Sequence, residues 1–218
     1  MFTGIVQEIG NLKQQVLGSN KYQLIIAGKK ILNNASKGDS IAVNGVCLTI
    51  VDYSTNSFTA DIMPETLNST NLKNLQRGEG VNLEQAVQPD GFFGGHLVTG
   101  HVDCLGRINH ITSNKNAKII EVSADEKLTD YIVDKGSVAL NGVSLTVVEV
   151  NKSSFSVSLI PETWNKTTFK NIKTGDEINI ETDLLGKYVV KMMKKWRDND
   201  NNKKNKIHKN FLKQNGFF

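Results

Sequence analysis

The sequence is poor in the features that build secreted or membrane proteins. It has only two cysteines in 218 residues, Cys47 and Cys104, which excludes a disulfide-built fold and a four-cysteine zinc site. No apolar run approaches the roughly 20 residues that a transmembrane helix needs. The start of the chain shows no basic segment followed by a long apolar stretch, so we expect neither a signal peptide nor a transit peptide. We therefore predict a cytoplasmic protein without a membrane partner.

Positive charge is also scarce outside the C-terminal end. The net charge is +4, yet residues 187–218 alone carry nine Lys and one Arg against two Asp, which leaves residues 1–186 with a net charge of −4. An acidic body argues against a nucleic-acid-binding face, which needs clustered Lys and Arg. A polyanion-binding module in the basic tail is an alternative. Because Asn is interleaved with the lysines, we interpret residues 198–218 as a solvated extension.

An internal repeat covers most of the chain. At an offset of 97 residues, Asn44–Thr49 (NGVCLT) lies over Asn141–Thr146 (NGVSLT). Over the 21 residues that begin with Pro-Glu-Thr, 10 positions are identical between Pro64–Glu84 and Pro161–Glu181. Self-similarity at a fixed offset indicates a duplicated structural unit.

The repeat defines the domain organisation. With one gap, Thr3–Val6 also lies over Thr99–Val102. We therefore predict two copies of one domain, at residues 1–90 and 97–184, followed by a C-terminal segment at 185–218. A Gly-rich junction separates the two copies, as expected of a turn or linker.

Short β-branched runs separated by turn residues predict strands in both copies. Asn44-Gly45 and Asn141-Gly142 are strong turn dipeptides, because Gly and Asn tolerate positive φ. About six short strands in each copy predict an all-β fold of two small closed barrels, since closure removes exposed sheet edges. The runs lie at residues 40–43, 48–51, 137–140 and 145–150.

Helix is expected as single turns within residues 66–75 and 163–172, and at greater length after Asp183. Asp183 is placed to cap the start of this longer helix. Its apolar residues recur at spacings of three and four, which is typical of an amphipathic helix. Either a neighbouring subunit or the protein's own barrels could cover this apolar stripe. The stripe consists of Leu185, Tyr188, Val189, Met192, Met193 and Trp196.

The two copies differ at chemically reactive positions. Ile5 of the first copy is His101 in the second, and Cys47 is Ser144. Two similar pockets with different reactive groups suit a reaction between two molecules of the same substrate. Enlargement of a scaffold by simple duplication is the alternative.

Four motifs in this order and spacing resemble the riboflavin synthase family, alpha chain. They are the start MFTGIV, the doubled Asn-Gly-Val-(Cys/Ser)-Leu-Thr, the junction GGHLVTGH at residues 94–101 and the doubled Pro-Glu-Thr. The resemblance covers nearly the whole chain. It implies two tandem six-stranded Greek-key β-barrels and a C-terminal amphipathic α-helix that joins three chains into a homotrimer.

The resemblance also implies an activity. Two molecules of 6,7-dimethyl-8-ribityllumazine would undergo dismutation, in which one transfers a four-carbon unit to the other. The products are riboflavin and 5-amino-6-(ribitylamino)uracil, and neither a metal nor an organic cofactor takes part. The site would lie between the N-terminal barrel of one subunit and the C-terminal barrel of the next. Lumazine synthase is an expected partner.

By position, the resemblance assigns substrate-binding residues to each pocket. The N-terminal pocket is expected to contain Gly4, Ile5, Val6, Cys47, Leu48, Thr49, Asp61, Ile62, Met63, Pro64, Glu65 and Thr66. The following residues are expected chiefly around the C-terminal pocket: Gly100, His101, Val102, Lys135, Ser144, Leu145, Thr146, Leu159, Ile160, Pro161, Glu162, Thr163 and Trp164.

His101 is the leading candidate for proton transfer, because imidazole titrates near neutral pH. His96 ranks below it, since a histidine in the Gly-rich junction can stabilise that turn instead. We interpret Cys47 as a substrate-facing residue that forms no covalent bond, with a small buried side chain as the alternative.

Two further residues are candidates for catalysis. Ser144 can polarise the ring edge or bind a hydroxyl of the substrate, and Lys135 can attract an anionic form of it, unless it is simply a solvated lysine. The chain departs from some members of the family at Asn141, where they carry Asp. A mechanism that needs a carboxylate there would have to use Asp183 or a bound water.

The main rival is a non-catalytic relative, similar to lumazine protein, that binds a lumazine or flavin as a chromophore. Such relatives have lost parts of the site. Because the chain retains His96, His101, Cys47 and the Met-Phe-Thr-Gly start, the sequence favours the enzyme.

Overall fold

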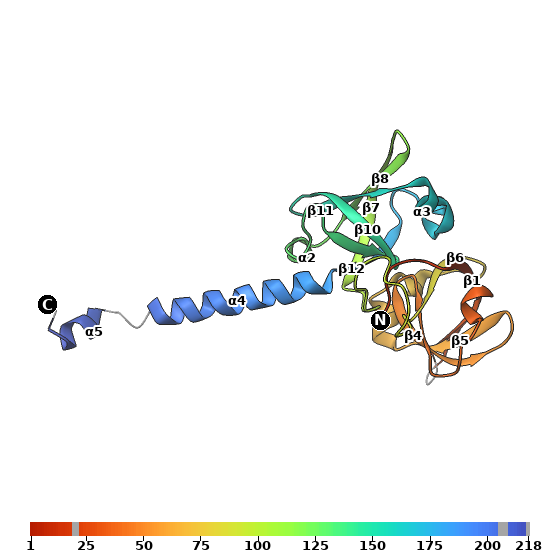
Figure 1. The fold of residues 1–218 in the computed structure, drawn as a ribbon, viewed down its shortest axis with the longest axis horizontal. Helices are drawn as coiled ribbons and strands as arrows, with labels where there is room; N and C mark the ends of the chain where they lie inside the picture. Colours follow the sequence, from red (N-terminus) through yellow and green to blue (C-terminus); the bar gives the residue numbers. More distant parts are fainter. Residues whose placement is uncertain (19–21, 205–208, 217–218) are drawn as a thin grey trace. The chain divides into compact units, whose positions relative to one another are not determined.

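The computed structural model describes residues 1–18, 22–204 and 209–216. The chain forms two compact units, Met1–Leu184 and Leu185–Phe218. The first unit holds two closed barrels, each built from six antiparallel strands (Figure 1). The N-terminal barrel consists of β1 (Glu8–Leu17), β2 (Tyr22–Ala27), β3 (Ser40–Val43), β4 (Val46–Tyr53), β5 (Ser57–Asp61) and β6 (Gly80–Gln85). The C-terminal barrel consists of β7 (Cys104–Asn114), β8 (Ala117–Ser123), β9 (Ser137–Leu140), β10 (Val143–Val150), β11 (Ser154–Leu159) and β12 (Glu177–Thr182).

Both barrels have the same Greek-key topology. The strand order is β1-β2-β5-β4-β3-β6 in the first, and the second repeats it with β7-β8-β11-β10-β9-β12. Even the irregularities recur, because the register shift between Ile50 and Asp52 on β4 reappears between Val147 and Glu149 on β10. The predicted all-β duplication is confirmed.

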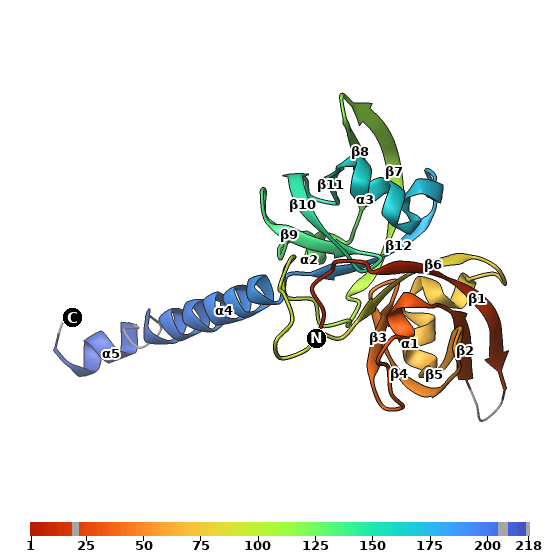
Figure 2. The same cartoon turned by 45° about the vertical axis from the view of Figure 1, so that its right-hand side comes forward.

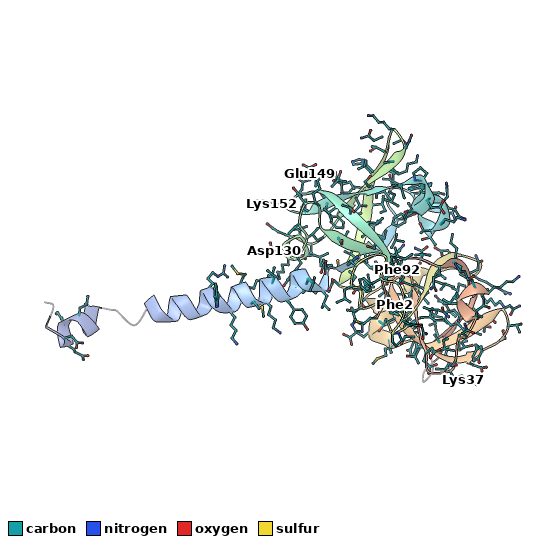
Figure 3. All side chains as sticks on the ribbon, in the orientation of Figure 1. Phe2, Lys37, Phe92, Asp130, Glu149 and Lys152 are labelled. Carbon is teal, nitrogen blue, oxygen red and sulfur yellow. The ribbon has the colours of Figure 1, made fainter. Side chains whose placement is uncertain are left out.

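Each barrel has its own apolar core. Phe58 and the equivalent Phe155 are fully buried, one in each core. Burial of one such side chain contributes roughly 1.5–3 kcal/mol to stability. A third, smaller cluster contains Phe2 and Val98, whose backbones pair in an isolated antiparallel bridge. Phe2 lies deep among the side chains, whereas Lys37 and Glu149 lie at the periphery (Figure 3).

The two Asn-Gly turns meet where the barrels pack together. Asn44 and Gly45 have φ of 46° and 79°, and Asn141 and Gly142 have φ of 46° and 77°, as a two-residue hairpin of type I′ requires. A Cβ on Gly45 would lie 2.7 Å from the backbone N of Gly142, and a Cβ on Gly142 would lie 2.6 Å from the N of Gly45. Each of these two positions therefore requires glycine for two reasons, namely the positive φ and the lack of room for a side chain.

Asparagine side chains seal this contact in equivalent pairs. Asn82 Nδ2 donates to the carbonyl of Asn141 at 3.0 Å, and Asn179 Nδ2 donates to the carbonyl of Asn44 at 2.8 Å. Since the four residues are buried, these bonds satisfy groups that water cannot reach. The reciprocal pattern gives the two barrels local pseudo-twofold symmetry.

Helices are short in the first unit. A proline at the first position starts both α1 (Pro64–Asn68) and α3 (Pro161–Lys166), two residues before the predicted ranges. In the view of Figure 2, α1 lies across the N-terminal barrel. The remaining short elements are η1 (Lys30–Leu32), η2 (Asn71–Asn74), α2 (Glu126–Thr129) and η3 (Thr168–Asn171).

The second unit is helical. α4 (Leu184–Lys204) starts directly after Asp183, as predicted, and α5 (Lys209–Gln214) follows it. The two helices extend into the predicted solvated extension at 198–218, up to Lys204 and within α5, and its solvation stays a prediction. Its Asn-rich composition hid the helix, because Asn is a weak helix former. The rest of that range, 205–208 and 217–218, lies outside the described residues. No helix in the described part of the chain is long and apolar enough to span a membrane.

Candidate active site

The segment before the first strand of each barrel packs on the other barrel. The N–H of Ser144, on β10 of the C-terminal barrel, donates to the carbonyl of Gly4 at 2.8 Å. In the equivalent contact, the N–H of Cys47 on β4 donates to the carbonyl of Gly100 at 2.9 Å. The two segments are thus exchanged between the barrels.

Apolar packing shows the same exchange. Val6 packs against the core of the C-terminal barrel, and Val102 packs against the core of the N-terminal barrel. The prediction that Gly4–Val6 line the N-terminal pocket is therefore wrong, and so is the placement of Gly100–Val102 around the C-terminal pocket. Each segment is close in sequence to one barrel but contacts the other.

Glycine permits this close approach. Gly4 and Gly100 have φ of 77° and 82°, which favours glycine. A Cβ on Gly4 would lie 2.6 Å from the Cβ of Ser144, and one on Gly100 would lie 2.5 Å from the Cβ of Cys47. The exchanged segments therefore lie directly against the two equivalent reactive positions.

A cavity of about 700 Å³ opens beside Ser144 on the C-terminal barrel. This volume is within the usual range of small-molecule sites. Six predicted residues line it, namely Gly4, Ile5, Val6, Ser144, Glu162 and Thr163. The sequence analysis missed three lysines of the lining, Lys30, Lys166 and Lys170. Lys30 belongs to η1 of the N-terminal barrel, whereas Lys166 and Lys170 lie four residues apart in the C-terminal barrel, so no single local motif marked all three.

His96 forms the shortest side-chain contact of Ser144. Its Nδ1 lies 2.7 Å from Ser144 Oγ, while its backbone N–H donates to Thr3 at 3.1 Å. The ring is buried, and within the described part of the chain its Nε2 has no hydrogen-bond partner. Burial lowers the pKa of His96, and the charge of Asp183 opposes this shift. A neutral imidazole that contacts a serine hydroxyl can accept its proton, and the predicted rank of His96 below His101 stays a prediction.

The N-terminal barrel brings together a related but different set of groups. Cys47 and Thr49 alternate along β4 with the buried Leu48, and Thr49 pairs with Asp61 on β5. His101 follows Gly100 in the exchanged segment, and its side chain is exposed. A thiol and an imidazole thus belong to the surface equivalent to that of Ser144.

The other predicted residues fall into two groups. The first has side chains inside the barrel cores, where only backbone groups remain to face a ligand: Leu48, Ile62, Leu145 and Leu159. The second is exposed or half-buried, with Thr146 within β10 and the others after strand ends or on the short helices: Met63, Pro64, Glu65, Thr66, Ile160, Pro161 and Trp164. Lys118 Nζ lies 5.5 Å from the ring centre of Trp164.

Lys135 occupies an unusual backbone position. It has φ of 65°, and its N–H donates to Val147 at 3.0 Å. The equivalent residue of the first copy is Gly38, with φ of 94° and the same bond to Ile50 at 2.9 Å. Lys135 is exposed and is not among the residues that line the cavity beside Ser144. Lys115 also has a positive φ, of 51°, and the predicted role of the Lys135 side chain stays a prediction.

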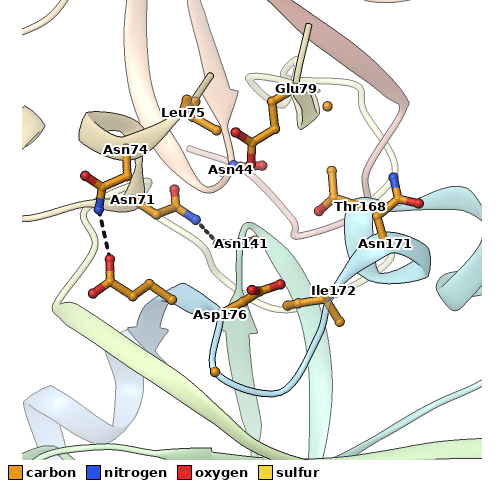
Figure 4. A pocket seen from close by; sticks show the side chains of 13 residues that line it. Asn44, Asn71, Asn74, Leu75, Glu79, Asn141, Thr168, Asn171, Ile172 and Asp176 are labelled. Carbon is orange, nitrogen blue, oxygen red and sulfur yellow. Dashed lines mark hydrogen bonds between the residues drawn. The ribbon is translucent and has the colours of Figure 1, made fainter. Parts of the chain in front are cut away.

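A second cavity, of about 370 Å³, lies between the barrels (Figure 4). Asn141 lines it, and its Oδ1 accepts bonds from the N–H of Asn179 and from Asn71 Nδ2, both at 2.9 Å. Asn141 is thus committed to the barrel interface, with Asn44 as its counterpart. Asp183 contributes instead to the electrostatic environment of His96.

Comparison with known proteins agrees with this geometry. The lumazine binding domain family matches residues 3–86 and 99–183. Riboflavin synthase of Bacillus subtilis is 42% identical over 217 residues and that of Actinobacillus pleuropneumoniae is 43% identical over 218, with all of both chains covered in each case.

Solved structures show the same fold. LumP in complex with 6,7-dimethyl-8-(1'-D-ribityl) lumazine has a TM-score of 0.75 and 26% identity, and LumP with riboflavin has a TM-score of 0.76 and 27% identity. Each match covers 84% of this chain and 99% of the other. The duplicated barrels, the two family matches and full-length relatives at more than 40% identity lead to one conclusion: the chain belongs to the riboflavin synthase family.

Proposed function

We propose that the chain catalyses the dismutation of two molecules of 6,7-dimethyl-8-ribityllumazine to riboflavin and 5-amino-6-(ribitylamino)uracil. One observation carries the proposal: two equivalent surfaces, each completed by an exchanged segment, present different reactive groups. One surface has Ser144 with the buried His96, and the other has Cys47 with His101. Such a pair can hold two identical molecules in different chemical roles.

The protein's contribution is orientation and proton transfer. The substrate ring is electron-poor, which makes one methyl group acidic and one ring carbon electrophilic. Holding two such rings in reacting geometry can lower the barrier by several kcal/mol. His96, through its 2.7 Å contact with Ser144, supplies a neutral base beside one ring, and His101 supplies a second imidazole beside the other. Cys47 contacts substrate without forming a covalent bond.

Turnover separates this function from that of a chromophore carrier. The purified chain is incubated with 6,7-dimethyl-8-ribityllumazine alone, and riboflavin is followed by absorbance and fluorescence. Steady formation of riboflavin is the expected result. Tight binding of the lumazine without riboflavin formation would support the carrier instead.

The active assembly is a homotrimer joined through α4, with each site completed between the N-terminal barrel of one subunit and the C-terminal barrel of the next. The apolar stripe of α4 supports this, since its six side chains are 57–76% exposed in the single chain. Burial of such a stripe drives association. Association with lumazine synthase stays a prediction from the sequence.

Trp196→Glu tests the trimer. A charge in the apolar stripe opposes its burial, so the variant is expected to sediment as a monomer and to lose most of its turnover. Analytical ultracentrifugation and the riboflavin assay measure the two effects. A trimeric variant with full turnover would contradict the role of α4.

Lys135→Gly is expected to raise stability and lower activity together. Glycine removes roughly 1 kcal/mol of left-handed strain, which raises Tm by about 2–4 °C in a chain of this size. Loss of the ammonium group lowers kcat/KM by about tenfold, the effect of one charge-assisted contact. Thermal melts and steady-state kinetics check both, with the exposed Lys152→Ala as control. Unchanged kcat/KM would show that Lys135 is only a solvated lysine.

A further inference from the structure

Two buried carboxylates hold the exchanged segments. Glu84, on β6, accepts bonds from the N–H of Thr3 at 2.7 Å, from Thr3 Oγ1 at 2.8 Å and from the N–H of Gly4 at 3.0 Å. Its side chain is 4% exposed.

The second copy repeats the arrangement. Glu181, on β12, accepts bonds from the N–H of Thr99 at 2.6 Å, from Thr99 Oγ1 at 2.7 Å and from the N–H of Gly100 at 3.0 Å. It is 3% exposed. Three donors fix each segment through one rigid side chain, and hydrogen bonds to a charged acceptor are among the stronger ones in proteins.

The two carboxylates act across the barrel boundary. Glu84 belongs to the N-terminal barrel, yet the Gly4 that it holds packs against Ser144 of the C-terminal barrel. Glu181 belongs to the C-terminal barrel and holds Gly100 against Cys47 of the N-terminal barrel. Each barrel therefore fixes the segment that completes the neighbour's ligand surface.

Resting on the proposed function, we propose that Glu84 and Glu181 are crossed positioning residues for the two ligand surfaces. Glu84 sets the geometry of the surface on the C-terminal barrel, and Glu181 sets that on the N-terminal barrel. Neither touches substrate. A purely structural role would instead weaken the barrel that carries the residue.

Equivalent thiols provide a matched reporter for each surface. Cys104, whose pKa burial raises to about 11, is removed as Cys104→Ser. Cys47 then reports the N-terminal surface, and Ser144→Cys in a Cys47→Ser background reports the C-terminal one. Each thiol is alkylated with iodoacetamide at increasing riboflavin concentration, which gives the concentration for half-protection.

The crossed arrangement predicts opposite results for two matched variants. Glu84→Gln places an amide donor against the N–H of Gly4. Half-protection of the thiol at position 144 is therefore expected to need about tenfold more riboflavin. At position 47, the concentration for half-protection should change by no more than about twofold. Glu181→Gln should do the reverse. Effects in the barrel that carries the substitution, or equal effects in both, would overturn the proposal.

Milder variants guard against misfolding. Thr3→Val and Thr99→Val each remove one hydroxyl bond to the carboxylate, and the same crossed pattern is expected at about threefold. The alkylation rate without riboflavin gives a second measure, because a loosened segment uncovers the thiol beneath it. If riboflavin protects neither reporter before Glu84 or Glu181 is changed, the proposed function fails. In that case, the alkylation rates measured without riboflavin decide the positioning role, since they should still change in the crossed pattern.

Discussion

Gly142→Ala is expected to lower the free energy of unfolding by roughly 3 kcal/mol, because two penalties combine at this position. The residue has φ of 77°, and its added Cβ would lie 2.6 Å from the backbone N of Gly45. That atom belongs to a packed turn and cannot rotate away. Equilibrium unfolding in urea measures the change, and Gly45→Ala should behave alike because the contact is reciprocal.

Gly175→Ala isolates the conformational part. Gly175 has φ of 95°, and no described atom beyond its own two chain neighbours lies within 4 Å of the place that its Cβ would take. The expected loss is about 1 kcal/mol, since only left-handed strain is added. Equal losses for Gly142→Ala and Gly175→Ala would show that the contact between the two turns is unimportant.

His96→Ala is expected to lower kcat by about 100-fold, the lower range for loss of a general base. Its ring is the group at 2.7 Å from Ser144 Oγ, so Ser144→Ala should cost a similar factor and the double variant little more. The control is His110→Ala, which changes an exposed residue on β7. If the losses of the two single variants instead multiplied in the double variant, His96 and Ser144 would have independent roles.

The pH profile tests the same assignment. Burial lowers the pKa of His96 below its ordinary value, so the ring is neutral at physiological pH. Activity should fall as pH drops through this lowered pKa, because the protonated ring cannot accept a proton. The neutral ring contributes to the free energy of unfolding in full above the unfolded-state pKa of His96. This contribution is lost as pH falls through the lowered pKa of the folded state. The acid limb should disappear in the residual activity of His96→Ala, and its persistence would assign it to another group.

The repeat made the fold predictable but not the exchange of segments. Each copy contains the Thr-Gly segment and the glutamate that holds it, so the same sequence fits a segment folded on its own barrel or on the neighbour. Only the packing of Gly4 against Ser144 and of Gly100 against Cys47 distinguishes the two. Local sequence has no information about that choice.

Residue-level errors have separate physical causes. His96 was a candidate of lower rank, and comparison of the copies gave it no counterpart, because the position 97 residues earlier lies before Met1. Leu48 and Leu145 could have been assigned to the cores in advance, since side chains in a strand alternate between faces. The positive φ of Lys135 could also have been predicted, because its counterpart in the repeat is Gly38.

The balance of products tests the central claim most directly. The chain is incubated with 6,7-dimethyl-8-ribityllumazine, and the lumazine, riboflavin and 5-amino-6-(ribitylamino)uracil are quantified by chromatography over the time course. Two equivalent surfaces that hold two molecules of one substrate predict one riboflavin and one pyrimidine for every two lumazines consumed. One riboflavin for each lumazine consumed, or no riboflavin at all, would contradict the account.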